Sequence, residues 1–284
     1  MVAHTRATCA AGSIAALILL SSSLSAQWPK YPTPGVPRNA SGEPMLDAPA
    51  PRTPDGKPDL SGIWMRFAGQ GGGATGTPVP APPGTPPIAT FFDVGAGFPE
   101  GLPFQPWAAE LKKTRNDANS KDNPDAHCLP MGFMQFHMHG QPRRIIQTPT
   151  LITILYEANF GLRYIFMDGR PLPPNGEPQP FWYGYSIGRW DGDTLVVETN
   201  NLKDDGWLDV RGSPFTDQAK ITERFRRVNF GKLEIDVTID DPKAYTKPFT
   251  VRVNQQIMVD GEMIEFICNE NNQFLNYLER TAGK

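Results

Sequence analysis

The sequence predicts an all-β protein whose strands form one meandering, antiparallel barrel. From Arg143 onward the chain is a series of short segments, rich in β-branched and aromatic residues, that turn material separates. Several segments alternate apolar and polar residues, as antiparallel strands with one buried face do. A sheet of many short strands closes on itself or splits into two packed layers. We therefore predict a barrel of about eight to ten strands, with a β-sandwich as the alternative.

The individual strands follow from local patterns. Leu233, Ile235, Val237 and Ile239 alternate with polar residues, and Asp191-Gly192-Asp193 between two strand-like segments is a strong hairpin signal. The expected strands span residues 60–66, 143–148, 151–158, 162–168, 182–190, 194–200, 221–228, 233–239, 249–259 and 263–269.

The first 26 residues have the pattern of a secretory signal peptide. Arg6 precedes an apolar run from about Ile14 to Leu20, and small residues lead to Ala26, where we expect cleavage. The apolar run is shorter than the roughly 20 residues that a membrane span needs. We therefore expect a periplasmic or secreted protein without a membrane-spanning segment.

The rest of the chain is expected to form one domain that follows a proline-rich N-terminal arm. Residues 27–58 contain so many prolines that we predict an extended arm. Residues 59–284 would then be a single β-barrel domain, with a Gly/Pro-rich insertion at about 68–103. Residues 106–118 begin with proline and predict a short helix, and residues 273–281 predict another.

Composition argues against some classes of function. The chain has 27 Lys and Arg against 30 Asp and Glu, and cleavage after Ala26 removes one basic residue, so the formal net charge falls from −3 to about −4. This balance does not predict a nucleic-acid surface. The sequence also lacks a Gly-x-Ser-x-Gly elbow, a Walker loop, a dinucleotide fingerprint and a zinc-protease helix motif. Whether the protein is an enzyme, and its oligomeric state, stay open.

Two cysteines, Cys128 and Cys268, follow the signal peptide. In an exported protein two cysteines far apart in sequence most often form a disulfide, and closing so long a loop stabilises by roughly 5 kcal/mol in the chain-entropy model. The alternatives are that Cys128 is a thiolate metal ligand beside His127, or that it is a free reactive thiol.

Three histidines gather between positions 127 and 139: His127, His137 and His139. If the segment is extended, His137 and His139 point to one face, and His127 could complete a zinc site with a fourth position open to water. The methionines of the same segment add copper as a possible cofactor, because thioether sulfur is a soft ligand. A metal-binding protein or metal-dependent enzyme is therefore one hypothesis. The alternative is a loop with surface histidines and methionines that fill gaps in the core.

Because side chains alternate between the two faces of a strand, several polar residues are expected on apolar faces. Glu223 shares the face of Ile221 and Phe225, and the same reasoning applies to Gln255, Glu157 and Asp168. A carboxylate in such a place must be paired, hydrogen-bonded or protonated, so each of these residues is a candidate for a site. The alternative is a structural pair with an arginine such as Arg163, Arg189 or Arg224.

Aromatic residues gather at 181–185, with Trp190 and Trp207 nearby. At a barrel mouth they would hold an apolar or ring-shaped ligand, although aromatic pairs in a core are the commoner case. The first functional hypothesis is therefore an exported barrel that binds a small apolar or aromatic molecule. Its expected polar contacts are Tyr183, Tyr185, Arg189 and Glu223. A structural or partner-binding envelope module is a further alternative.

Several sequence blocks are spread over nearly the whole chain beyond the signal peptide. They are PRTPDGKPDLSGIW at 51–64, PFQPWA at 103–108, CLP at 128–130, IQTP at 146–149, FMDGRP at 166–171, GRWDGDTLVVET at 188–199, TERF at 222–225 and CNEN at 268–271. These blocks resemble a large family of uncharacterised exported bacterial β-rich proteins. The resemblance implies an exported β-rich domain in which the CLP and CNEN blocks are shared, and it implies no activity. Separately, Gly62-x-Trp64 resembles the motif that opens lipocalin barrels, which implies a barrel of lipocalin or broader calycin type.

Overall fold

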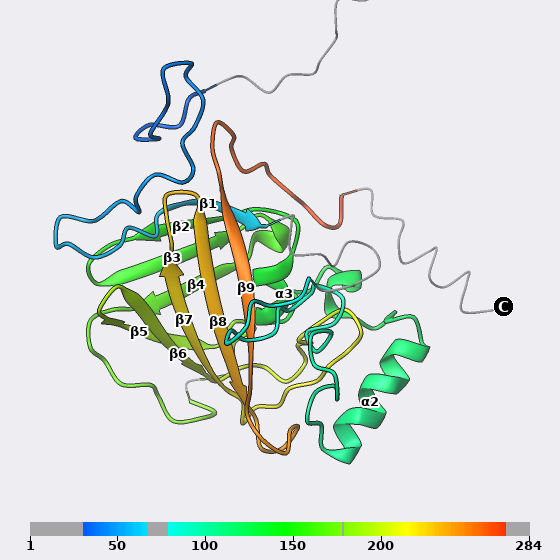
Figure 1. Ribbon diagram of the computed structural model, residues 1–284. Coiled ribbons are helices and arrows are strands. Elements are labelled where there is room, and N and C mark those ends of the chain that lie inside the picture. The colour runs from blue at the N-terminus through cyan, green and yellow to red at the C-terminus, as the bar shows by residue number, and fades with distance from the viewer. Residues whose placement is uncertain (1–30, 68–78, 178, 271–284) are drawn as a thin grey trace, which may run out of the picture.

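Nine strands form one closed barrel in the computed structural model, which describes residues 31–67, 79–177 and 179–270 (Figure 1). The strands follow one another around the barrel in chain order, and the last strand pairs with the first. They are β1 Gly62–Arg66, β2 Arg143–Gln147, β3 Leu151–Tyr156, β4 Leu162–Phe166, β5 Tyr185–Asp191, β6 Thr194–Asn200, β7 Lys220–Arg227, β8 Lys232–Asp240 and β9 Phe249–Met258. The predicted all-β barrel is thus confirmed. The expected signal peptide and the helix at 273–281 lie outside the described residues.

One pair of strands departs from the predicted antiparallel meander. β4 and β5 run parallel, and their ladder has only two residue pairs, Ile165 with Ser186 and Phe166 with Ile187. Residues 167–184 turn the chain back, so that β5 begins beside the last residues of β4 and runs in the same direction. A second correction concerns residues 263–269, which form no strand.

The helices that the structure describes are short. They are α2 Pro106–Asp117, the single turn η2 Pro124–His127, α3 Phe133–Met138 and the single turn η3 Ala158–Phe160. α2 confirms the helix predicted at 106–118, and Pro106 occupies its first turn, where the missing N–H costs no hydrogen bond. None of the described helices is long and apolar enough to cross a membrane.

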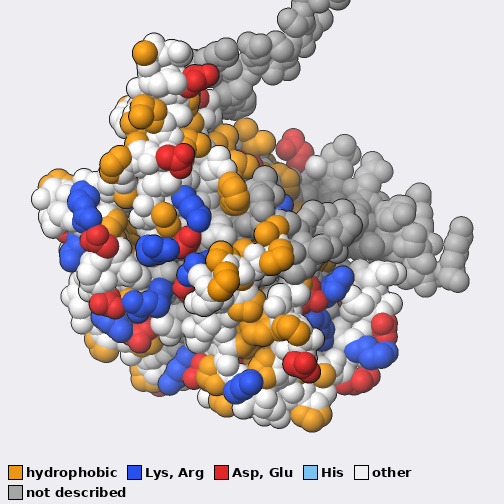
Figure 2. Space-filling view, in the orientation of Figure 1, with side chains coloured by type: hydrophobic (Ala, Val, Ile, Leu, Met, Phe, Trp, Pro, Cys, Tyr) orange, Lys and Arg blue, Asp and Glu red, His pale blue; other side chains and the backbone are white. Residues whose placement is uncertain are grey.

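The two faces of the barrel wall differ in chemistry. Inward-facing residues of β8 such as Ile235 and Val237 are fully buried. The outer face of the same region carries paired charges of both signs, including Glu234 with Lys232 at 2.8 Å and Arg252 with Asp236 at 2.6 Å (Figure 2). This division follows the period-two alternation, so the hydrophobic effect fixes the register of these strands.

The helix α3 closes one end of the barrel from the inside. All six of its side chains are buried, and the Phe136 ring lies 4.3 Å from the ring of Tyr156 on β3. At the start of α3 a Cβ on Gly132 would lie 1.8 Å from the Trp207 carbonyl oxygen, so only glycine fits there. We call this end, where β3 finishes and β4 begins, the plugged end.

The opposite end of the barrel, which we call the open end, is crossed by the N-terminal arm. Residues 51–58, named the strap below, form a small loop closed by hydrogen bonds from Thr53 N to Lys57 O and from Asp59 N to Pro51 O, both 2.9 Å. Further back, the Phe230 N–H donates to Ala48 O at 2.7 Å. Residues 48–58 of the predicted extended arm therefore lie against the barrel, whereas the first described residues of the arm stand away from its strands (Figure 1).

Trp64 fills the barrel interior near β9. Its side chain is fully buried, and its indole N–H donates to Leu60 O at 2.9 Å. The guanidinium of Arg227 lies 4.9 Å from the centre of the ring and donates to Phe230 O. The indole and the guanidinium thus pack against each other inside the barrel.

Candidate functional site

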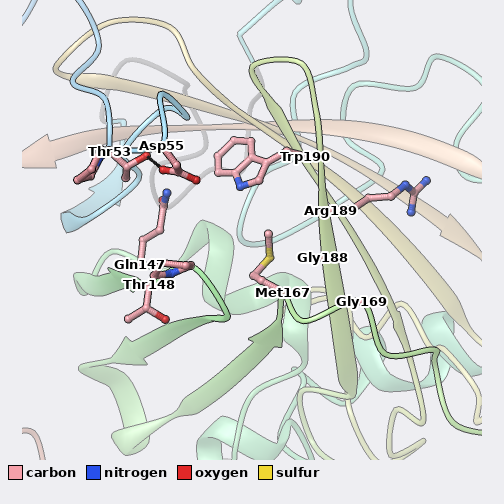
Figure 3. Close-up of a pocket in the computed structure, with 11 residues that line it drawn as sticks. Thr53, Asp55, Gln147, Thr148, Met167, Gly169, Gly188, Arg189 and Trp190 are labelled. Atoms are coloured by element: carbon pink, nitrogen blue, oxygen red, sulfur yellow. Dashed lines mark hydrogen bonds between the residues drawn. The ribbon is translucent and has the colours of Figure 1, made fainter.

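A cavity of about 550 Å³ lies at the open end, beneath the strap (Figure 3). Its walls come from four segments: the strap, the β2–β3 turn, the residues that follow β4, and the second half of β5. The residues that define its shape are Thr53, Asp55, Gln147, Met167, Gly188 and Trp190.

Strand phase explains why apolar groups face this cavity. Ser186, Gly188 and Trp190 share the inner face of β5, and Met167 continues the inner face of β4. A Cβ on Gly188 would lie 2.5 Å from the Met167 sulfur, so the glycine lets Met167 pack directly on β5. The Met167 thioether and the Trp190 indole therefore form opposite apolar parts of one wall (Figure 3).

The polar groups of the cavity lie on the strap side. The Thr53 hydroxyl donates to the Asp55 carboxylate. Gln147 is fully engaged, because its side-chain oxygen accepts from Leu60 N at 2.8 Å and its amide donates to Pro58 O at 3.1 Å. Gln147 thus fixes the base of the strap to β2, and Asp55 is the carboxylate that a bound molecule would meet.

A bidentate ion pair fastens the strap over the cavity. Arg52 donates to both carboxylate oxygens of Asp193 in the β5–β6 turn, at 2.9 and 2.6 Å, and to Gly56 O at 2.7 Å. The same contact lowers the pKa of Asp193 through a hydrogen bond and the positive charge of Arg52. Both side chains are more than half exposed, so the pair positions the strap and adds little stability.

A buried polar cluster lies deeper in the barrel, against α3. His137 Nε2 is 2.6 Å from Glu223 Oε1, and Arg163 donates to both oxygens of the same carboxylate. Arg163 also donates to the hydroxyls of Ser186 and Thr199 at 3.0 Å. Glu223 thus faces inward as predicted, in a pair with Arg163.

The pKa shifts of Glu223 and His137 indicate which of the two side chains is charged. Burial raises the pKa of Glu223, but the charge of Arg163 and the hydrogen bonds from His137 and Arg163 outweigh it and hold the pKa at about 2. Burial lowers the pKa of His137 despite the neighbouring carboxylate. Its Nδ1 is buried without a hydrogen-bond partner, which fits a neutral imidazole that donates from Nε2. Glu223 and Arg163 are therefore an ion pair, and His137 links α3 to it.

The histidine-rich segment does not have the geometry that the metal hypothesis needed. The segment is not extended, because Phe133–Met138 form the helix α3. All six side chains of this helix are buried, and only Gln135 and His137 among them are polar. His127 is exposed and its Nε2 contacts Lys121 O, while His139 Nδ1 accepts from Gln141 N. Among the described residues no group of three His, Cys, Asp or Glu side chains could hold a metal ion.

The two cysteines pair as predicted. Cys128 and Cys268 form a disulfide with a sulfur–sulfur distance of 2.08 Å. The bridge joins the turn after η2 to the segment that follows β9. It excludes the alternative in which Cys128 is a thiolate metal ligand.

The four predicted ligand contacts lie in three different places. Glu223 is in the core, and Arg189 stands at the rim of the cavity but points away from it and pairs with Glu198 at 2.8 Å (Figure 3). Tyr183 and Tyr185 line a separate groove between β4 and β5. Sequence reasoning missed Met167, Gly188 and the strap, although all three fall within the sequence blocks.

Of the other three polar residues predicted on inner faces, two are buried and one is not. Gln255 is buried and donates to His137 O at 3.2 Å, and Glu157 is buried and accepts from Ile264 N at 2.9 Å. The inward position predicted for Asp168 is wrong. Arg163 and Ile165 set the inner face of β4, so Asp168 lies in the outer phase and pairs with Arg170.

Comparison of the chain with models of protein families, with curated proteins and with solved structures finds no match.

Proposed function

We propose that this chain is an exported barrel protein that binds a small apolar or aromatic molecule in the open-end cavity. The observation that carries the proposal is the cavity itself. Its volume of about 550 Å³ falls in the range of roughly 300–1,000 Å³ that small-molecule sites occupy. It lies at the end of the barrel that α3 leaves open.

The walls indicate the character of the ligand. Met167 and Trp190 offer polarizable, apolar surfaces that suit a ring. Asp55 on the strap is the nearest carboxylate, so a ligand with a hydrogen-bond donor or a positive charge at one edge would fit best. We therefore favour an aromatic or alicyclic molecule with one donor group.

Export is part of the proposal and rests on three supports. The first 26 residues have the composition of a signal peptide. The Cys128–Cys268 disulfide is of the kind that persists in oxidising compartments. The sequence blocks resemble exported bacterial β-rich proteins, and Gly62-x-Trp64 supports a lipocalin-like type of barrel.

The test uses N-phenyl-1-naphthylamine, a neutral aromatic probe whose fluorescence rises when it leaves water. The chain from Gln27 onward, with its disulfide intact, is titrated with the probe and compared with Met167→Trp, which fills the cavity. We expect saturable binding by the parent chain and at least a tenfold higher Kd for the variant. Met45→Trp is the matched control, because Met45 is an exposed arm residue outside the cavity, and its Kd should be unchanged.

Two outcomes would overturn this function. One is the absence of saturable probe binding to the parent chain. The other is an equal Kd for Met167→Trp and the parent. If Met167→Trp fails to fold, Pro149→Trp replaces it, because Pro149 lines the cavity from an exposed turn that tolerates substitution better. An unchanged Kd for that variant counts against the proposal in the same way.

A further inference from the structure

The barrel wall has a seam between β4 and β5. The two strands pair only at Ile165 and Phe166, and toward the plugged end they separate. A groove of about 350 Å³ occupies the space, and its walls include Leu162, Tyr164, Phe181 and Tyr185. Because each of the other strand pairs of the described barrel has a longer ladder, the seam is the most weakly paired place in the wall.

Backbone donors point into this groove. The Met167 N–H donates to Thr150 O, on the β3 side of β4. Successive residues of a strand alternate between its two neighbours, so the N–H groups of Leu162 and Tyr164 point the other way, toward β5. The described part of β5 has no ladder partner for either residue. The groove therefore offers backbone hydrogen-bond donors as well as aromatic side chains.

The surface beside the seam is unusually apolar. Phe160, Leu162 and Tyr164 are 57%, 42% and 46% exposed, and they follow one another along the start of β4. The outer faces of β7, β8 and β9 instead carry ion pairs (Figure 2). Large apolar side chains that are exposed next to one another are typical of a site of interaction.

The chain after β9 runs toward this surface. Glu262 pairs with Arg144 on β2 at 2.7 Å, and Ile264 N donates to Glu157, just beyond β3, at 2.9 Å. The segment thus crosses β2 and then β3, and the next strand around the barrel is β4.

The disulfide then anchors this segment next to the seam. Cys268 is joined to Cys128, with 5.5 Å between their Cα atoms, and Asn159 donates to Leu129 O at 3.1 Å. Asn159 belongs to η3, the turn that leads into β4. The last described residues are therefore fixed within a few residues of the groove.

We propose that residues 271–284 of the same chain bind in the seam groove. These 14 residues begin at position 271, shortly after the anchored Cys268, and could reach up to about 46 Å when extended. They include Phe274, Leu275, Tyr277 and Leu278, apolar side chains that match the walls of the groove. Binding would bury the exposed rings and cover the unpaired edge of β4, which otherwise invites association with another chain.

Hydrogen exchange of the Leu162 and Tyr164 amides tests this proposal. The chain from Gln27 onward is compared with a chain that ends at Glu270 and keeps the disulfide. If the segment covers the seam, both amides are protected in the longer chain and exchange at least tenfold faster in the shorter one. A synthetic peptide of residues 271–284, added to the shorter chain, should restore the protection.

Two further variants separate specific binding from a general effect of the segment. Phe274→Asp with Leu278→Asp should speed exchange of both amides, whereas Asn272→Asp with Asn276→Asp adds the same charge and should not. Equal exchange rates in the long and short chains would overturn the proposal. So would protection that rises with protein concentration, because a second copy would then be the occupant.

Discussion

Replacing Glu223 with glutamine removes the charge that links α3 to the barrel wall. The substitution leaves the Arg163 guanidinium buried without a carboxylate to balance its charge, although the neutral glutamine and the Ser186 and Thr199 hydroxyls can still accept hydrogen bonds from it. Breaking a buried ion pair by removing one partner costs about 3–5 kcal/mol. The lowered pKa of Glu223, which follows from the charge of Arg163 and the hydrogen bonds from His137 and Arg163, agrees in direction with a carboxylate that is stabilised in its charged form. We therefore expect the free energy of unfolding of Glu223→Gln to be lower than that of the parent chain by about 3 kcal/mol.

Urea unfolding at pH 7 under oxidising conditions measures this loss of stability. Circular dichroism and tryptophan fluorescence both follow the unfolding transition. Glu198→Gln is the matched control, because it makes the same chemical change in an exposed pair with Arg189 and should cost less than about 1 kcal/mol. Replacing Arg163 with methionine in the Glu223→Gln background should recover part of the loss. A loss below 1 kcal/mol for Glu223→Gln would refute the idea that the cluster fixes α3.

Three further predictions concern the plug and the strap. Burial and, to a smaller extent, the charge of Arg143 lower the pKa of His139 from 6.5 to about 4 in the folded protein. As the pH falls, His139 is therefore protonated in the unfolded chain before it is protonated in the folded protein. Stability should therefore fall as the pH drops from about 6.5 to 4, by at most roughly 3 kcal/mol, and His139→Gln should flatten that part of the curve. Gly132→Ala should lower the free energy of unfolding by more than about 2 kcal/mol, because its Cβ would collide with the facing backbone. Arg52→Ala should speed probe release from the open-end cavity several-fold and change stability by less than about 1 kcal/mol.

Each of these predictions has a control in the same chain. An unchanged pH profile for His139→Gln would mean that this imidazole is not the group that titrates. Gly140→Ala should be nearly neutral, since nothing lies within 4 Å of the added carbon, and equal losses for the two glycine variants would contradict the close fit. Arg189→Ala breaks an equally exposed ion pair beside the cavity. If it speeds probe release as much as Arg52→Ala does, the strap has no special role.

The strands were predictable because one physical pattern defines them. In β7 and β8 the alternation of buried and exposed residues placed the strand ends within about one residue and put Glu223 on the inner face. The disulfide was predictable from compartment and cysteine count. The direction of β5 was not, because alternation is the same for parallel and antiparallel strands.

The site was harder to predict because it depends on segments that are distant in sequence. The strap, Gln147, Met167 and Trp190 meet only when the barrel closes. α3 was misread for another reason. Six residues are too few to show helical periodicity, and His137-Met138-His139 alternates as a strand would. What makes this segment a helix is the barrel around it, which buries every side.

The most direct test of the central claim is a crystal structure of the chain from Gln27 onward, grown with N-phenyl-1-naphthylamine. If α3 closes one end of the barrel and the strap covers a ligand site at the other, the naphthalene ring will lie between Met167 and Trp190 beneath residues 51–58. A ring bound in the seam groove or on the outer surface, with the open-end cavity left empty, would contradict the account.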